Sequence, residues 1–185
     1  MNETIRTILS RRSTRKFGEA QISDAELDML IEVARFAPSA HNGQQRHFIA
    51  VQNKDLLGRI NDLCRKIYLA SDNQFMRQRA ESEDFCVFHN APTVIVVCGD
   101  QTSIAPECNC ALSLGNVLLA AESLGLGGCW IHGIAALQTS DEGRALLSEI
   151  GVPKGYSVYG SAAIGNLPER PMAAPRREGC VTILR

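Results

Sequence analysis

The sequence lacks the short motifs that identify the commonest phosphate, metal and nucleophile sites. No Gly-x-Gly-x-x-Gly follows a predicted strand, since Gly125-Leu126-Gly127-Gly128 has the wrong spacing, and there is no Gly-x-x-x-x-Gly-Lys ending in Ser or Thr. His-Glu-x-x-His and Gly-x-Ser-x-Gly are also missing, and the four histidines are scattered: His41, His47, His89 and His132. These absences disfavour a Rossmann dinucleotide site, a P-loop and a metal hydrolase.

Cysteine pattern, charge and apolar runs exclude further classes. The seven cysteines form an odd set without a Cys-x-x-Cys pair, which argues against a disulfide framework or a metal site, and we expect most to be buried apolar residues. A formal net charge of -1 gives no overall field toward nucleic acid or an anionic membrane. Met1-Asn2-Glu3-Thr4 begins no secretory signal and no apolar stretch approaches membrane-spanning length, so we expect a cytoplasmic protein.

The 185 residues, 45% of them hydrophobic, suffice for one sizeable core, and we expect a single domain over residues 1–185. The apolar spacing predicts helices near 5–9, 24–34, 56–67, 111–124 and 140–150, the second with a capping box at Ser23 and Glu26. Strands are predicted at 47–52, 93–98, 127–133 and 157–165, with a final one at 180–184. Residues 71–84 form a lid or a solvated connection. The mixture indicates an α+β fold, a sheet with helices packed around it.

The most concentrated polar stretch is Arg11-Arg12-Ser13-Thr14-Arg15. The planar fork of arginine fits phosphate oxygens in pairs, so a phosphorylated ligand is the functional interpretation, while a solvated basic turn is the alternative. A second basic pair, Arg176-Arg177, stands near the other end of the chain. The two clusters can meet over one phosphate if the termini lie close together.

Two further stretches suit a ligand site. The loop from Pro38 to Gln45 is rich in hydrogen-bonding groups, and the glycines of Gly127–Gly133 let backbone approach a ligand closely. No obvious acid, base or nucleophile accompanies them. Such a site suits a cofactor that brings its own reactivity.

Four motifs together resemble those of the FMN-dependent nitroreductase family. They occur in the family's order and span nearly the whole chain: Arg11-Arg12-Ser13-Thr14-Arg15, Ala37-Pro38-Ser39-Ala40-His41-Asn42-Gly43-Gln44, Gly125-Leu126-Gly127-Gly128-Cys129-Trp130-Ile131, and Ile164-Gly165-Asn166-Leu167-Pro168 followed by Arg176-Arg177. The resemblance implies a mostly antiparallel central sheet surrounded by helices, in an interlocked homodimer with two FMN molecules at the interface.

The resemblance also assigns roles to residues. Arg11 and Ser13 would hold the ribityl phosphate, joined by Arg176 or Arg177. Arg12 belongs to the same basic run. Arg15 would lie at the pyrimidine edge of the flavin, where a cation stabilises the reduced, anionic ring, and Asn73 would contact the same edge. The ring would also be lined by residues of the partner subunit: Pro38, Ser39, Asn42 and Gln44. Behind the ring would lie Trp130, Ile131 and Gly133. A backbone N–H of His132 or Gly133 would point at flavin N5. No metal is implied.

The sequence departs from the family pattern in three places. Gln45-Arg46-His47 follows the loop where the family commonly has Pro and an aromatic residue. Cys108 and Cys110 flank Asn109, and they are either incidental or have a redox or iron-related role. Because the chain is short, any lid, within residues 70–90, must be short.

The expected activity is an oxidoreductase reaction. NADH or NADPH would deliver a hydride to flavin N5, and a small electron-poor acceptor such as a nitroaromatic or a quinone would then take the electrons. The alternatives are a narrower flavin reaction (dehalogenation, flavin fragmentation or dehydrogenation), a non-catalytic FMN sensor or storage protein, and a small interaction domain without a cofactor.

Overall fold

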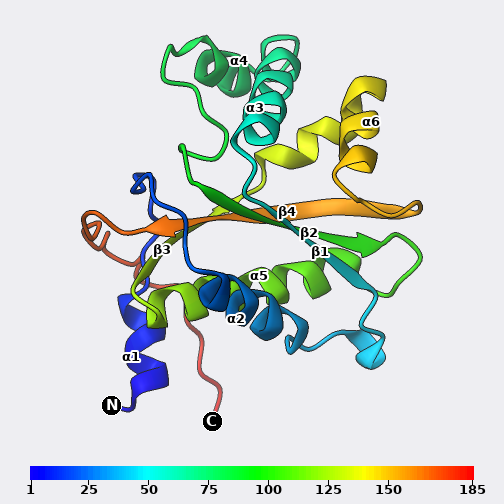
Figure 1. The fold of residues 1–185 in the computed structure, drawn as a ribbon. Coiled ribbons are helices and arrows are strands. Elements are labelled where there is room, and N and C mark those ends of the chain that lie inside the picture. The colour runs from blue at the N-terminus through cyan, green and yellow to red at the C-terminus, as the bar shows by residue number, and fades with distance from the viewer.

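A four-stranded antiparallel sheet lies between two layers of helices in the computed structural model, which describes all residues 1–185 (Figure 1). The strands are β1 (Arg46–Val51), β2 (Thr93–Asp100), β3 (Leu126–Ile131) and β4 (Tyr156–Asn166), in the spatial order β1-β2-β4-β3. This architecture confirms the α+β prediction. Strands β1 and β3 form the two opposite edges of the sheet. Predicted site residues next to β1 are therefore far from those next to β3.

The helices divide between the two faces of the sheet (Figure 1). One face carries α3 (Lys54–Leu69), α4 (Gln74–Glu81), the 3₁₀ segment η2 (Gly133–Thr139) and α6 (Asp141–Glu149). The other carries α2 (Asp24–Arg35) and α5 (Pro106–Ser123), with α1 (Glu3–Ser10) beside α5 and the short 3₁₀ turn η1 (Ala40–Asn42) at the far end. No helix has both the length and the apolar character needed to cross a membrane.

The position of β2 in the middle of the sheet explains why its sequence is apolar throughout and does not alternate with polar residues. Residues Thr93–Gly99 are all buried, because helices cover both faces of the strand. Val94, Val96 and Cys98 join the core under α3 and α6, whereas Ile95 and Val97 join the core under α2 and α5. Four of the seven cysteines are buried in these cores, which confirms the expected role of most of them: Cys64, Cys98, Cys110 and Cys129.

The boundaries of α2 and α5 follow local signals. Ser23 and Glu26 form the predicted capping box at the start of α2. Helix α5 begins five residues before the predicted start, because Ala105 takes a left-handed conformation (φ 51°) and Pro106 can occupy the first helical turn. Gly125 ends the helix at φ 75°, a conformation that glycine adopts without a steric cost.

Two segments differ from the prediction. Residues 71–84 contain the helix α4, because Asn73 caps its first turn by accepting from the N–H groups of Phe75 and Met76. The predicted strand at 180–184 is wrong: residues 167–185 have no helix or strand. A strand needs a neighbour for its backbone groups, and this terminal segment pairs with no strand of the sheet.

Candidate functional site

The basic stretch Arg11–Arg15 lies along the outer edge of β3. The Thr14 N–H donates to the Gly128 carbonyl oxygen at 3.0 Å, and Ser13 forms a parallel bridge with Gly128. The Thr14 side chain is only 2% exposed. The stretch is therefore seated against the edge of β3 by one bridge and one backbone hydrogen bond, with Thr14 buried, instead of forming a fully solvated turn.

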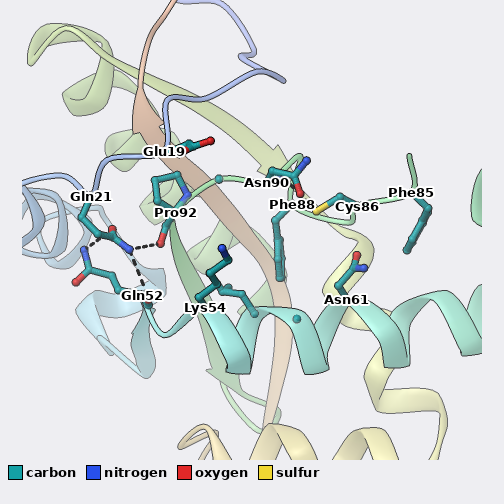
Figure 2. Close-up of a pocket in the computed structure, with 13 residues that line it drawn as sticks. Glu19, Gln21, Gln52, Lys54, Asn61, Phe85, Cys86, Phe88, Asn90 and Pro92 are labelled. Atoms are coloured by element: carbon teal, nitrogen blue, oxygen red, sulfur yellow. Dashed lines mark hydrogen bonds between the residues drawn. The ribbon is translucent and has the colours of Figure 1, made fainter. Parts of the chain in front are cut away.

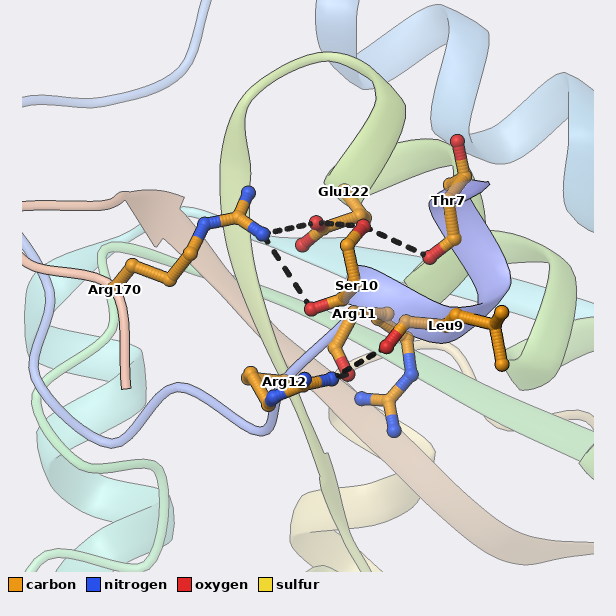
Figure 3. Close-up of polar contacts among 7 residues, drawn as sticks. All are labelled: Thr7, Leu9, Ser10, Arg11, Arg12, Glu122 and Arg170. Atoms are coloured by element: carbon orange, nitrogen blue, oxygen red, sulfur yellow. Dashed lines mark hydrogen bonds and ion pairs between the residues drawn. The ribbon is translucent and has the colours of Figure 1, made fainter. Parts of the chain in front are cut away.

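This extended conformation separates the five side chains into two sets. Alternate side chains of an extended segment point to opposite sides, so Arg11, Ser13 and Arg15 share one side while Arg12 and Thr14 share the other. Arg12 Nη1 donates to the carbonyl oxygens of Leu9 and Arg11, at 2.8 and 2.9 Å, and so caps the end of α1 (Figure 3). The three residues left on the first side form a row of donors.

Gly127 makes the close approach of the basic stretch possible. A Cβ atom at this position would lie 2.8 Å from Thr14 Cγ2 and 3.0 Å from Thr14 Oγ1, closer than such atoms pack. Because Thr14 is buried against β3, it has little room to move aside. The glycine motif after α5 thus serves to seat the basic stretch.

The donor row and a neighbouring residue of α4 together contribute three guanidinium groups that have no carboxylate partner. Arg11, Arg15 and Arg79 of α4 take part in none of the ion pairs of the structure. Burial raises the pKa of the Cys129 thiol, and the charges of these three arginines oppose that rise, so all three act electrostatically on the same residue of β3. Such a cluster of unpaired cations is suited to an anionic ligand.

His89 lies beside the same cations. Burial, followed by the charges of Arg79 and Arg15, lowers the pKa of His89 below its usual range. Its backbone has a positive φ of 55°. Neither Arg79 nor His89 belonged to a motif in the sequence, since one lies in the polar run before residue 84 and the other in an irregular segment.

A polar network joins the C-terminal segment to the basic stretch (Figure 3). Glu122 of α5, with its side chain 9% exposed, accepts from Ser10 Oγ and pairs with Arg170 Nη1, both at 2.7 Å. Arg170 Nη1 also lies 3.4 Å from the Ser10 carbonyl oxygen. The segment that carries Arg176 and Arg177 therefore starts beside the end of α1, while the role of these two arginines stays a prediction.

The structure places Asn73 at the start of α4, where its Oδ1 caps the helix. Only the Nδ2 group remains for another partner. Its predicted contact with the pyrimidine edge therefore depends on that one amide donor and stays a prediction.

The end of β3 presents the second group of expected residues. Ile131 is buried, whereas Trp130 points to the α5 face and is 40% exposed. Gly133 packs so closely on Tyr68 and Val87 that an added Cβ would lie within 2.7 Å of each. No hydrogen bond of the structure uses the His132 N–H, so this donor is free for a ligand.

The loop Pro38–Gln44 lies at the opposite edge of the sheet, before β1 (Figure 1). Arg46 pairs with Gly99 and through it with Ser157, while Ser13 bridges Gly128, which pairs with Ile164. With typical strand spacings and rises, Ser13 and Arg46 are roughly 30 Å apart. The fold of a single chain therefore brings Arg11, Ser13 and Arg15 together, but leaves Pro38, Ser39, Asn42 and Gln44 far from them.

A separate cavity of about 580 Å³ lies between the start of α3 and residues 85–92 (Figure 2). Its polar lining includes Glu19, Lys54 and Asn61, and its apolar lining includes Phe85 and Phe88. None of the predicted site residues lines it. This cavity is thus distinct from the donor row on β3.

Comparison with known proteins gives a consistent picture. The model of the nitroreductase family matches residues 8–166. The chain is 27% identical to an FMN reductase [NAD(P)H] of Bacillus subtilis over 95% of this chain and 70% of that protein, and 28% identical to an NADPH-flavin oxidoreductase of Vibrio harveyi over 99% and 73%. A solved nitroreductase with bound FMN from Bacteroides fragilis superposes with a TM-score of 0.93 at 33% identity, covering 100% of both chains.

Proposed function

Because the chain belongs to the nitroreductase family, we propose that it is an FMN-dependent oxidoreductase that takes electrons from NADH or NADPH. The acceptor is a small electron-poor molecule such as a nitroaromatic or a quinone. The printed functions of the relatives from Bacillus subtilis and Vibrio harveyi support the flavin and the nicotinamide donor. The single structural observation that carries the proposal is the row of Arg11, Ser13 and Arg15 on one side of an extended segment.

The residues present fit FMN by the chemistry of their donors. The phosphate of FMN carries two negative charges near neutral pH, and the site offers guanidinium groups that no carboxylate neutralises. Arg11 and Ser13 would hold the phosphate, since they lie on the same side of the segment. Arg15 would lie at the pyrimidine edge. Arg12 would act indirectly, by fixing the end of α1.

When bound, FMN supplies the redox chemistry, because its ring system takes up and releases two electrons with a proton. The chain supplies charge and position. Arg15 and Arg79 would supply positive charge near the ring, and positive charge there favours electron uptake. The free N–H of His132, or that of Gly133, would donate a hydrogen bond to ring atom N5. Ile131, on the same face of β3 as Cys129, would pack behind the ring, whereas the predicted contact of Trp130 would have to come from the opposite face of the strand.

We also propose that the functional unit is a homodimer. The loop Pro38–Gln44 is roughly 30 Å from the donor row within one subunit, so only a second copy can place Ser39, Asn42 and Gln44 against the same ligand. Exposed apolar side chains mark surfaces for such contact: Ile5, Ile8 and Leu9 on α1, Phe36 after α2, and Val181, Ile183 and Leu184 near the C-terminus. The unpaired terminal segment would then extend over the partner subunit. The expected location of the dimer is the cytoplasm.

One observation favours a narrower reaction as the second candidate. Helix α4 stands where the sequence allowed a simple connection, and it carries Arg79 toward the cation cluster. A helix in this position would restrict which acceptor reaches the ring, and its cation would favour an acceptor with a negative group. A dehalogenation or dehydrogenation of a specific acidic compound would fit this arrangement.

The test is an anaerobic absorbance titration of the purified protein reconstituted with FMN. We expect NADH or NADPH to bleach the flavin absorbance near stoichiometric addition, and the better of the two identifies the donor. Bound FMN that neither nucleotide reduces would favour a sensor or a specialised reaction. A protein that binds no FMN would refute the proposal.

A further inference from the structure

The loop between α2 and β1 has an unusual backbone. His41, Asn42 and Gln44 all have φ between 50° and 53°, in the left-handed region that non-glycine residues seldom adopt. Such conformations raise the free energy of the loop and persist only where surrounding contacts hold them. The loop therefore needs a device that fixes its shape.

Arg46, the first residue of β1, supplies that device. Its Nη1 donates to Ser113 Oγ of α5 at 2.8 Å, and its Nη2 donates to the Ala37 carbonyl oxygen at 2.9 Å. Three weaker contacts at 3.4 Å reach the carbonyl oxygens of Arg35, Pro38 and Asn109. One guanidinium group thus joins the end of α2, the start of the loop and helix α5.

The charge of Arg46 has no carboxylate partner. It makes no ion pair, and its Nε is buried without a hydrogen-bond partner. The carbonyl oxygens at the C-terminal end of α2 balance the charge instead, because the helix dipole is negative there. A half-buried cation with an unsatisfied donor contributes little to the stability of a fold, because desolvation opposes its burial. We therefore look for the role of Arg46 in the loop that it positions.

Asn109 holds the loop from the same side. Its Oδ1 accepts from the Ala40 N–H at 3.0 Å, and its Nδ2 donates to the Ile104 carbonyl oxygen at 2.9 Å. Within the loop, Ser39 Oγ accepts from the Gln44 N–H at 3.0 Å. Two residues therefore fix the loop to α5: Arg46, through Ser113, and Asn109, which belongs to α5 itself.

We propose that Arg46 is a positioning residue: it holds the strained loop Ser39–Gln44 in the shape that receives the FMN bound by the other subunit. This inference rests on the proposed function, in which that loop lines the ring. It gives a role to a residue at which this sequence departs from the Pro and aromatic pattern. Arg46 itself touches neither ring nor substrate, since its donors are directed to backbone and to Ser113.

The experiment compares Arg46→Lys and Arg46→Leu with the wild type in two measurements. Hydrogen exchange of the protein without FMN reports on the amides of Ala40, Asn42, Gly43 and Gln44, all of which make hydrogen bonds. FMN affinity is measured by quenching of flavin fluorescence. Arg46→Lys keeps the charge and most of the stem but loses the planar fork, so it guards against simple loss of folding. Arg35→Ala is the matched control, because it removes a nearby exposed cation that pairs only with Glu32.

We expect both Arg46 variants to speed exchange of the loop amides by about tenfold or more, while amides of β2 keep their wild-type rates. The FMN dissociation constant should rise by about tenfold in Arg46→Lys and further in Arg46→Leu, and Arg35→Ala should match the wild type. Unchanged loop exchange, or an equal increase in β2, overturns the inference. So does wild-type FMN affinity in both variants. If the wild type itself binds no FMN, the proposed function fails, and the exchange data still decide whether Arg46 fixes the loop.

Discussion

The Thr14 N–H donates to the Gly128 carbonyl oxygen at 3.0 Å, and this bond joins the beginning of the chain to the edge strand β3. Residues 11–15 would otherwise form a connection whose arginines sample many positions. With the bond in place, the sheet determines which side of the segment each side chain faces. The positions of Arg11, Ser13 and Arg15 thus depend on the core of the protein and not on the loop alone.

The alternation of side chains predicts different effects for two adjacent arginines. Arg11→Ala should raise the FMN dissociation constant by about tenfold or more, since a charge-assisted hydrogen bond contributes roughly 1.5–3 kcal/mol. Arg12→Ala, which removes the same charge but only a cap on α1, should raise it by less than about threefold. Fluorescence titration of both variants with FMN makes the comparison. Equal losses would show that overall charge, not side-chain direction, governs binding.

The contact between Gly127 and Thr14 can be tested by a pair of substitutions. Gly127→Ala places a Cβ 2.8 Å from Thr14 Cγ2 and should lower the free energy of unfolding by about 1–3 kcal/mol. In the Thr14→Ala/Gly127→Ala double variant the two nearest atoms, Thr14 Cγ2 and Oγ1, are gone and only the Cβ at 3.1 Å remains, so the two effects should be less than additive. Urea unfolding of the four proteins without FMN gives the coupling. Additive losses would contradict the described contact.

His89 should titrate below its usual value of about 6.5 in the folded protein. Because the folded state binds this proton less readily than the unfolded state, stability is lost as pH falls below the unfolded pKa. FMN should raise the pKa of His89, since an anionic ligand brings negative charge to the cation cluster that includes Arg15 and Arg79. NMR titration of the imidazole with and without FMN measures both. His89→Asn, which tolerates the positive φ, should weaken the loss of stability in acid. A midpoint at the usual value would refute this assignment.

The network around Glu122 predicts that loss of this carboxylate loosens the C-terminal segment. Glu122→Gln leaves Arg170 without its partner and should cost about 1–2 kcal/mol, less than for a fully buried pair because Arg170 is half exposed. Trypsin should then cleave faster after Arg176 or Arg177. Glu149→Gln is the control, since it removes an exposed pair with Arg59 whose loss costs at most about 1 kcal/mol. If the two variants resist trypsin equally, the pair does not hold this segment.

Mixed dimers test whether each site takes residues from two subunits. One variant carries Arg11→Ala and Arg15→Ala, and the other carries Asn42→Asp, which keeps the left-handed backbone but sets a carboxylate against the ligand. Alone, each should bind little FMN. After subunit exchange in an equal mixture, about a quarter of all sites should be intact, because half of the dimers are mixed and each has one complete site. FMN binding that does not recover would place both groups in a site of one subunit.

The sequence predicted the elements better than their arrangement. The capping box at Ser23, the apolar run of β2 and the glycine end of α5 are local signals, and the structure confirms them. Helix α4 was missed because its residues are polar, and a single Asn73 cap gave too weak a signal. The strand predicted at 180–184 had the right composition, but pairing depends on neighbours that composition does not specify.

The site was likewise predictable in part. The basic stretch and the motif resemblance predicted Arg11, Ser13 and Arg15 as site residues, because phosphate recognition uses donors that are close together in the sequence; the structure places the stretch on the edge of β3, and the phosphate role stays a prediction. Strand order is a tertiary property, so the opposite placement of the Pro38–Gln44 loop required the structure. The same holds for Arg79, His89 and Arg46, whose roles depend on contacts between distant segments.

The contact of Ser13 and Thr14 with Gly128 also covers part of an open edge of the sheet, the kind of edge through which proteins aggregate. Without this segment, β3 would present an open row of backbone N–H and C=O groups, and its glycines Gly127 and Gly128 would offer no bulky side chains to block another chain. Exposed edges of this kind pair with one another between molecules. We therefore expect a chain shortened by its first fifteen residues to lose solubility as well as the predicted phosphate-binding residues. Since the segment is synthesised more than a hundred residues before β3, the edge is covered as soon as the strand forms.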